Sequence, residues 1–135
     1  MSDMKLFDGT TGLLKTVLDL RFRNQQVIAG NLANADTPGY APARLDFEQD
    51  LEQALSTGAG PLVTDPRHIG AGNDPQQVHG RVIRTPDRSG IGDHNGVNVD
   101  QEMINLSENQ ILYETATRIL NKKLGLLKYV IQDGR

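Results

Sequence analysis

The residues best suited to acid–base or metal chemistry are three histidines, and their spacing favours neither role. His68, His79 and His94 stand 11 and 15 residues apart in a stretch rich in glycine and proline. Histidine ligands in short metal motifs lie roughly three to five residues apart. The sequence contains no Cys, which excludes thiolate ligands and cysteine nucleophiles. We therefore expect no metal and no cofactor.

Other short patterns also fail as chemical sites. "DHNGVNVDQE" has the residue types of a calcium loop, but the required Gly and Glu positions, counted from Asp93, hold Asn98 and Ile104. Asn95-Gly96 is interpreted as a tight turn before a helix. "STGAGP" and "IGAGND" lack the Lys-Ser/Thr pair of a phosphate-binding loop. The carboxylates of "DFEQDLE" fit the solvated face of a short helix, so we expect no enzyme.

Charge and composition argue against a nucleic-acid partner and against membrane insertion. The net charge of −3 and the isoelectric point near 5.5 argue against nucleic acid, which calls for a clustered basic surface. No stretch approaches the ~20 apolar residues that span a bilayer, so we expect no direct membrane insertion. Asp3, Asp8 and Asp19 interrupt the region where a signal peptide needs a basic end and an apolar core. We therefore expect no cleaved signal peptide.

Both ends of the chain have the pattern of a long helix. Seam positions recur in alternating steps of four and three residues, which is the spacing of a coiled coil. The residues expected to pack in the two seams are Leu13, Val17, Leu20 and Val27 at the N-terminal end, and Met103, Leu106, Tyr113, Leu120, Leu124 and Leu127 at the C-terminal end. Asn98 or Asp100 can cap the second helix. The two seams are expected to face each other.

The chain divides into four parts. Residues 1–40 form a helix and a turn, residues 41–56 a short helix capped by Asp46, residues 57–96 a flexible loop-rich segment, and residues 97–135 the C-terminal helix. Within the loop-rich segment, "PLVT" and "QVHGRVIR" could form short strands that depend on partners. The expected fold is mainly α. Its terminal helices pair as an antiparallel coiled-coil-like hairpin, with a partly disordered middle that carries at most short β-strands.

Such a hairpin cannot cover all of its apolar surface. The residues beside the seams that are candidates for burial against neighbouring subunits are Leu14 and Leu18 on the first helix, and Ile104, Ile111 and Ile119 on the second. Helical patterns of this length usually belong to coiled coils or assemblies. An ordinary hairpin with scattered exposed leucines is the alternative, and the thin, loop-rich middle favours assembly.

The stretch "NLANADTPGY" ends the first helix with an unusual set of residues. The turn motif comprises Asn31, Asn34, Thr37, Pro38, Gly39 and Tyr40. Pro38 cannot donate to the helix and pushes Thr37 out of helical geometry, and Pro38-Gly39 fits the centre of a type II turn. Asn31 and Asn34 are polar residues at seam positions, which typically set register and partner choice. Their amides can also satisfy free carbonyls at the helix end.

The turn motif resembles the N-terminal motif of the axial proteins of the bacterial flagellum, which are the rod, hook and hook-associated proteins. "ARLDF" and the shortness of the chain are most similar to the proximal rod proteins of the basal body. "VNVDQEMINLSENQILYETATRILNKKLGLLKYVI" resembles their C-terminal helix, and "LVTDPRHI" a mid-chain segment. The sequence departs from the family after Tyr40, where Ala41-Pro42-Ala43 precedes Arg44.

The resemblance implies a structural subunit of the proximal rod, which assembles helically with other axial proteins and transmits torque across the periplasm. It implies export by the flagellar type III apparatus without signal cleavage. The implied partners are other rod proteins, further copies of the chain, and the MS-ring, rod-adaptor and export-gate components at the base of the rod. The alternative is a cytoplasmic helical adaptor or type III export chaperone, which would also be acidic and amphipathic. A chaperone should be a stable dimer, and a rod subunit should be mostly monomeric.

Overall fold

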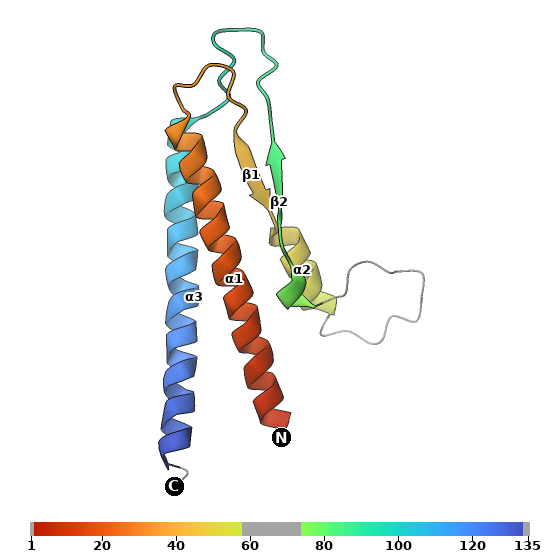
Figure 1. The fold of residues 1–135 in the computed structure, drawn as a ribbon, viewed down its shortest axis with the longest axis vertical. Helices are drawn as coiled ribbons and strands as arrows, with labels where there is room; N and C mark the ends of the chain where they lie inside the picture. The colour runs from red at the N-terminus through yellow and green to blue at the C-terminus, as the bar shows by residue number, and fades with distance from the viewer. Residues whose placement is uncertain (1, 58–73, 134–135) are drawn as a thin grey trace, which may run out of the picture.

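Two long helices form the frame of the molecule. The structure, a computed structural model, describes residues 2–57 and 74–133. Helices α1 (Ser2–Ala33) and α3 (Val99–Asp133) pack side by side in opposite directions, so that the start of α1 and the end of α3 lie at the same end (Figure 1). At ~1.5 Å per residue, each helix is roughly 50 Å long. The expected antiparallel and mainly α architecture is confirmed.

The N-terminus of α3 is capped as the sequence predicts. The backbone N–H of Gln101 donates to Asn98 Oδ1 at 3.1 Å. Asp100 and Glu102 stand in the first turn, where carboxylates interact favourably with the positive end of the helix dipole. Asn98 is therefore the residue at which the loop ends and α3 begins.

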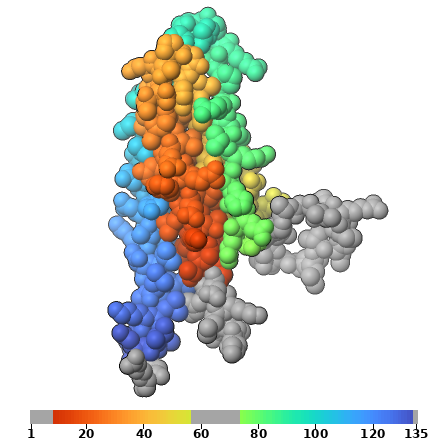
Figure 2. All heavy atoms as spheres, in the orientation of Figure 1, coloured from red at the N-terminus to blue at the C-terminus, as the bar shows by residue number. Residues whose placement is uncertain are grey.

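A two-stranded antiparallel sheet covers another side of α1. Strand β1 (Ala43–Asp46) pairs with β2 (Arg81–Arg84), with Ala43 opposite Arg84 and Asp46 opposite Arg81. Figure 2 shows α1 flanked by α3 on one side and β2 on the other. The expectation of a helix over residues 41–56 is wrong for its first part, because only Glu48–Thr57 is helical (α2). The reason is a period of two: Ala43, Leu45 and Phe47 are buried while Arg44 between them is exposed.

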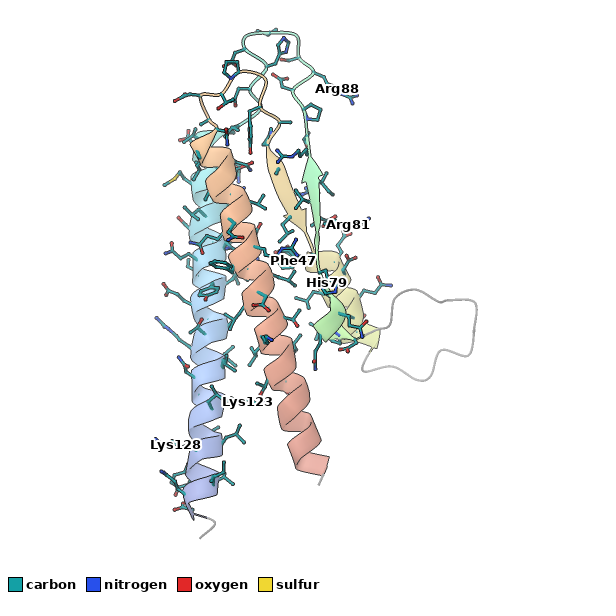
Figure 3. The ribbon with its side chains drawn as sticks, viewed as in Figure 1. Phe47, His79, Arg81, Arg88, Lys123 and Lys128 are labelled. Atoms are coloured by element: carbon teal, nitrogen blue, oxygen red, sulfur yellow. The ribbon has the colours of Figure 1, made fainter. Side chains whose placement is uncertain are left out.

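The apolar core lies between α1 and this strand. Leu20, Leu45 and Phe47 form its centre with 2–5% of their surface exposed, and Val27 and Val78 pack against them. Figure 3 shows Phe47 beside α1, where β1 passes into α2. Burying a side chain of this size contributes about 1.5–3 kcal/mol. This small core fixes the strand segment onto α1.

A short 3-10 turn, η1 (Pro75–Gln77), also packs on α1. Asp74 caps it by accepting the Gln76 N–H at 2.9 Å. The Gln76 side chain comes so close to Gly12 that an added Cβ on Gly12 would lie 2.5 Å from it. Gly12 is therefore a point of close approach, and a larger residue there would require the end of the flexible Gln76 side chain to move.

The loop-rich segment divides into two parts. The expected "PLVT" strand and His68 lie outside the described residues, as does the stretch "LVTDPRHI". In "QVHGRVIR" the structure contains β2, which pairs with β1 of the same chain. The expectation that β-structure here depends on partners is therefore wrong for Arg81–Arg84. Residues 74–96 also lie against α1 and the turn motif, so they have contacts within the chain.

The expected seam residues fall into different environments. Leu20 is buried and lies in one cluster with Val27, Leu45, Phe47 and Val78. This part of the N-terminal seam therefore also packs against the strand segment. Met103 and Leu124 are half exposed, at 50% and 47%. The half-buried seam residues are Leu13, Val17, Leu106, Tyr113, Leu120 and Leu127. Their role in pairing α1 with α3 stays a prediction.

Candidate functional site

The candidate site is the turn motif, and its most buried member is Asn31. Its side chain is 1% exposed. Asn31 Nδ2 donates to the carbonyl oxygen of Ala43 at 2.7 Å, and the N–H of Ala43 donates to Asn31 Oδ1 at 2.8 Å. One amide thus satisfies both backbone groups of the first residue of β1, as a neighbouring strand would. The end of α1 and the start of β1 are joined at this point.

Tyr40 completes the surroundings of Asn31. Its hydroxyl donates to Asn31 Oδ1 at 3.4 Å, so the oxygen of Asn31 has two donors. Arg84 of β2 lies over the Tyr40 ring, with its guanidinium carbon 5.8 Å from the ring centre, and donates to the carbonyl oxygen of Ala41 at 3.0 Å. Cation–π contacts of this kind contribute about 0.5–1 kcal/mol at exposed sites. Tyr40 therefore connects the turn to both α1 and β2.

The turn itself has the predicted type II geometry. The N–H of Tyr40 donates to the carbonyl oxygen of Thr37 at 3.3 Å, which places Pro38 and Gly39 at the two central positions. Gly39 has a φ of +72°, the left-handed region that favours glycine. An added Cβ on Gly39 would meet no atom within 4 Å. The need for glycine is therefore conformational and not a matter of space.

Asn34 closes the end of α1. Its Nδ2 donates to the carbonyl oxygen of Gly30 at 2.8 Å, and its Oδ1 accepts the hydroxyl of Thr37 at 3.2 Å. The Gly30 carbonyl also accepts the backbone N–H of Asn34 at 3.2 Å, so the Asn34 side chain adds a second donor to a carbonyl that is not free. Thr37, Pro38 and Gly39 are exposed, so the tip of the turn faces outward from one end of the hairpin.

The loop before α3, residues 93–96, forms hydrogen bonds with the turn motif. Asn95 Nδ2 donates to the carbonyl oxygens of Asn34 and Thr37, at 2.8 and 2.6 Å. The N–H of Gly39 donates to the carbonyl oxygen of Asp93 at 2.7 Å, and the N–H of Gly96 to that of Tyr40 at 3.1 Å. The loop that leads into α3 thus holds the turn that ends α1, so the two helices are tied together at this end.

Sequence reasoning identified Asn95 only as part of a tight turn. Its own Oδ1 accepts the N–H of Val97 at 2.8 Å, which is the local bond that the Asn-Gly pattern indicates. The two bonds to the distant turn carry no local signal, because Asn95 lies 58 and 61 residues from its acceptors. The sequence indicated only that Asn95 is a hydrogen-bonding residue in a loop next to a long helix.

A second pair of asparagines sets the contact between α1 and α3. Asn24 Nδ2 donates to Asn109 Oδ1 at 3.0 Å, and Asn109 Nδ2 donates to the backbone carbonyl of Arg21 at 2.9 Å. Asn109 is 2% exposed. Asn24 continues the four- and three-residue steps of the N-terminal seam between Leu20 and Val27. Asn109 lies outside the expected seam residues, and sequence reasoning missed it.

A groove of about 370 Å³ opens between α1, β1 and α3. It is lined largely by polar side chains, including Arg21, Asn24, Glu48 and Glu102. Arg21 pairs with Glu48 at 3.1 Å and lies over the Phe47 ring. Glu102 Oε2 has no hydrogen-bond partner among the described residues. The groove lies at the junction of α1, the strand segment and α3.

The arrangement offers anchoring and not ligand chemistry. Among residues 9–56 and 74–133, no three His, Asp or Glu side chains gather closely enough to hold a metal ion. Most polar contacts of the turn motif involve a backbone group, and the two between side chains, Thr37 with Asn34 and Tyr40 with Asn31, lie within the motif itself. The site can therefore set where α1 stops, where β1 starts and how the loop before α3 meets them.

Comparisons with known proteins agree on one family. A family model described as flagella basal body rod protein matches residues 20–40, a stretch that ends with the turn motif. The flagellar basal body rod protein FlgB of Yersinia enterocolitica is 30% identical over 133 residues, covering 94% of this chain and 96% of that protein. The FlgB of Bacillus subtilis (strain 168) is 33% identical over 132 residues, covering 98% and 100%. That of Aeromonas hydrophila is 34% identical over 124 residues, covering 90% and 92%.

Proposed function

Since the chain belongs to the family of flagellar basal-body rod proteins, we propose that it assembles helically with other axial proteins in the proximal rod and transmits torque across the periplasm. The rod role is structural and requires no catalysis. The observation that carries this proposal is the turn motif, with its buried Asn31, because it fixes one end of a stiff helical hairpin and leaves Thr37, Pro38 and Gly39 exposed.

The apolar surface of α3 supports assembly. The exposed large apolar residues of this helix include Met103, Ile104, Ile111, Ile119, Leu126, Tyr129, Val130 and Ile131, each with 50–71% of its surface exposed. Exposed apolar residues in this number on one helix support a site of protein–protein contact. Each side chain covered by a neighbour contributes about 1.5–3 kcal/mol, so a few of them can offset the cost of ordering a subunit.

Torque transmission needs stiff subunits. Antiparallel helices joined at one end by the turn motif, and at one point farther along by Asn24 and Asn109, would resist both sliding and splaying. A helical stack of such hairpins, each bonded to several neighbours, would carry a twisting load through side-chain packing. The proposed mechanism is therefore assembly into a tube.

The proposed partners follow from the place of the proximal rod. They are other rod proteins, further copies of this chain, and MS-ring, rod-adaptor and export-gate components at the rod base. We propose export through the flagellar type III apparatus without signal cleavage. Within residues 2–57 and 74–133, no helix is long and apolar enough to cross a bilayer.

Quantitative mass spectrometry of purified basal bodies from the source cell tests the proposed location. Peptides of this chain should occur in the rod fraction at an abundance comparable to those of other rod subunits. Intact basal bodies without the chain, with all of it in the cytosol, would overturn the proposal and favour the adaptor or chaperone.

A further inference from the structure

The outer surface of α3 carries a pattern that fixes how a second copy would lie against it. We propose that α3 packs against α3 of a neighbouring copy in the same direction but shifted by about two heptads, so that the acidic half of one helix meets the basic half of the next. This inference rests on the proposed function, since a rod contains copies that all point the same way.

Charge is segregated along α3 beyond what a single helix needs. The acidic residues of its first half are Asp100, Glu102, Glu108 and Glu114, and the charged residues that follow are the basic Arg118, Lys122, Lys123 and Lys128, apart from Asp133 at the C-terminal end. The helix dipole favours this order only within the first and last turns. Glu108 and Lys122 lie more than two turns from either end, so the dipole does not account for them.

Exposed apolar residues recur along one side of α3, roughly every two turns. We define the outer stripe as Ile104, Ile111, Ile119, Leu126 and Val130, which are 50–66% exposed. The steps between them are seven, eight, seven and four residues, so they share one side of the helix. The buried residues of α3, Asn109 and Ala116, lie on a different side. The outer stripe is therefore a second seam, which α1 does not use.

Glu108 and Lys122 lie within the outer stripe. Glu108 follows Ile104 by four residues, and Lys122 precedes Leu126 by four, a spacing that places each charge beside its apolar neighbour. Neither charge forms an ion pair within the described residues, where the pair on α3 joins Glu114 and Arg118. Figure 3 places Lys123 and Lys128 on the half of α3 that ends at the C-terminus.

One shift satisfies both the apolar and the charged pattern. Moving a parallel copy by 15 residues, about 22 Å, places Ile104 opposite Ile119 and Ile111 opposite Leu126. The same shift brings Glu108 between Lys122 and Lys123 of the neighbour. Without a shift, like charges would face each other, which is unfavourable. The apolar contacts would supply affinity, and the charges would select the register.

Cysteine cross-linking can test this register, because the chain has no cysteine of its own. The variant with Ile104→Cys and Ile119→Cys should form disulfides between successive copies and give a ladder of multimers. Within one chain the two positions are about 22 Å apart on the helix, too far for a disulfide. The cells would carry the variant as their only copy, and basal bodies would be oxidised mildly and run on non-reducing gels.

The matched control distinguishes the opposite orientation. An antiparallel pair centred on Thr115 would place Ile104 opposite Leu126, so the variant with Ile104→Cys and Leu126→Cys would cross-link in that case and not in the shifted parallel one. A ladder from the first variant and none from the second is the expected result. Basal bodies that contain the chain but give no ladder from the first variant would overturn the register and leave the proposed function standing. Basal bodies without the chain would overturn both.

Charge reversal tests the selecting role of Glu108 and Lys122. In the Ile104→Cys and Ile119→Cys background, Glu108→Lys alone or Lys122→Glu alone should lower the yield of the ladder about threefold, as expected for a surface pair. The double reversal should recover part of the lost yield, since opposite charges meet again at positions 108 and 122 while Lys123 still faces position 108. A double reversal no better than either single change would show that the charges do not set the register.

Discussion

At the scale of single residues, side-chain amides that bond to the backbone hold the turn motif in place. The buried Asn31 amide forms hydrogen bonds with both the N–H and the carbonyl of Ala43. The Asn95 amide donates to two carbonyl oxygens of the turn. A buried backbone group left without a partner costs about 1–3 kcal/mol. These amides are therefore expected to contribute more to stability than their small size indicates.

Replacing Asn31 by Ala should destabilise the chain by about 2–4 kcal/mol, because both backbone groups of Ala43 lose their partner in a buried environment. Urea unfolding of the full-length chain, followed by circular dichroism, measures this free energy. Asn121→Ala is the matched control, since Asn121 is exposed on α3, and it should change the free energy by less than about 0.5 kcal/mol. Equal effects of the two substitutions would contradict the role given to Asn31.

Replacing Gly39 by Val should block assembly and abolish swimming, because a β-branched residue at a φ of +72° is strained. Gly39→Asn should swim better than Gly39→Val, since Asn tolerates this region more easily. Soft-agar swimming with cells that carry each variant as their only copy measures the effect. Full swimming of the Gly39→Val cells would show that the turn does not need its left-handed residue.

At the scale of elements, the two long helices could be predicted from the sequence because the four- and three-residue steps persist over many turns. The turn was also predictable, since Pro38-Gly39 has local geometry of its own. Strand β1 was not, because its four residues adjoin a helical pattern and the partner strand lies about 40 residues away in sequence, at Arg81–Arg84. The long-range amide bonds of Asn95 and Asn109 have no local signature, so only the fold reveals them.

The Asn24–Asn109 contact predicts a coupled effect on the pairing of α1 with α3. Asn109→Ala should cost about 1–3 kcal/mol, because it removes both bonds of the Asn109 amide and leaves the Asn24 Nδ2 without this acceptor. Adding Asn24→Ala should then cost less than it does alone, since Asn24 has already lost its partner. Urea unfolding of the two single variants and the double variant gives the coupling energy. Strictly additive effects would mean that the two amides act independently.

At the scale of the whole molecule, the chain buries one small core and leaves the apolar outer stripe exposed. Composition and the length of the helical patterns predicted that the chain alone would leave part of its apolar surface uncovered. They could not show that α1 is shared between α3 and the strand segment, because that depends on the path of the chain after Tyr40. The same path of the chain after Tyr40 determines which side of α3 stays exposed for contact with neighbouring subunits.

Replacing Ile111 by Asp should separate folding from assembly. Ile111 is 66% exposed, so the free energy of unfolding of the isolated chain should change by less than about 1 kcal/mol. Incorporation into basal bodies should fall strongly, because a charge would be buried between copies. Gln110→Asp, at an exposed position next to it, is the control and should assemble more fully. Normal incorporation of the Ile111→Asp chain would mean that this surface is not an interface.

Electron cryo-microscopy of basal bodies purified from the source cell tests the central claim most directly. The account predicts the α1–α3 hairpin of this chain in the proximal rod, with the turn motif ordered as described and the outer stripe of α3 covered by a neighbouring subunit. A well-resolved rod without this hairpin, or one in which the outer stripe faces solvent on every copy, would contradict it.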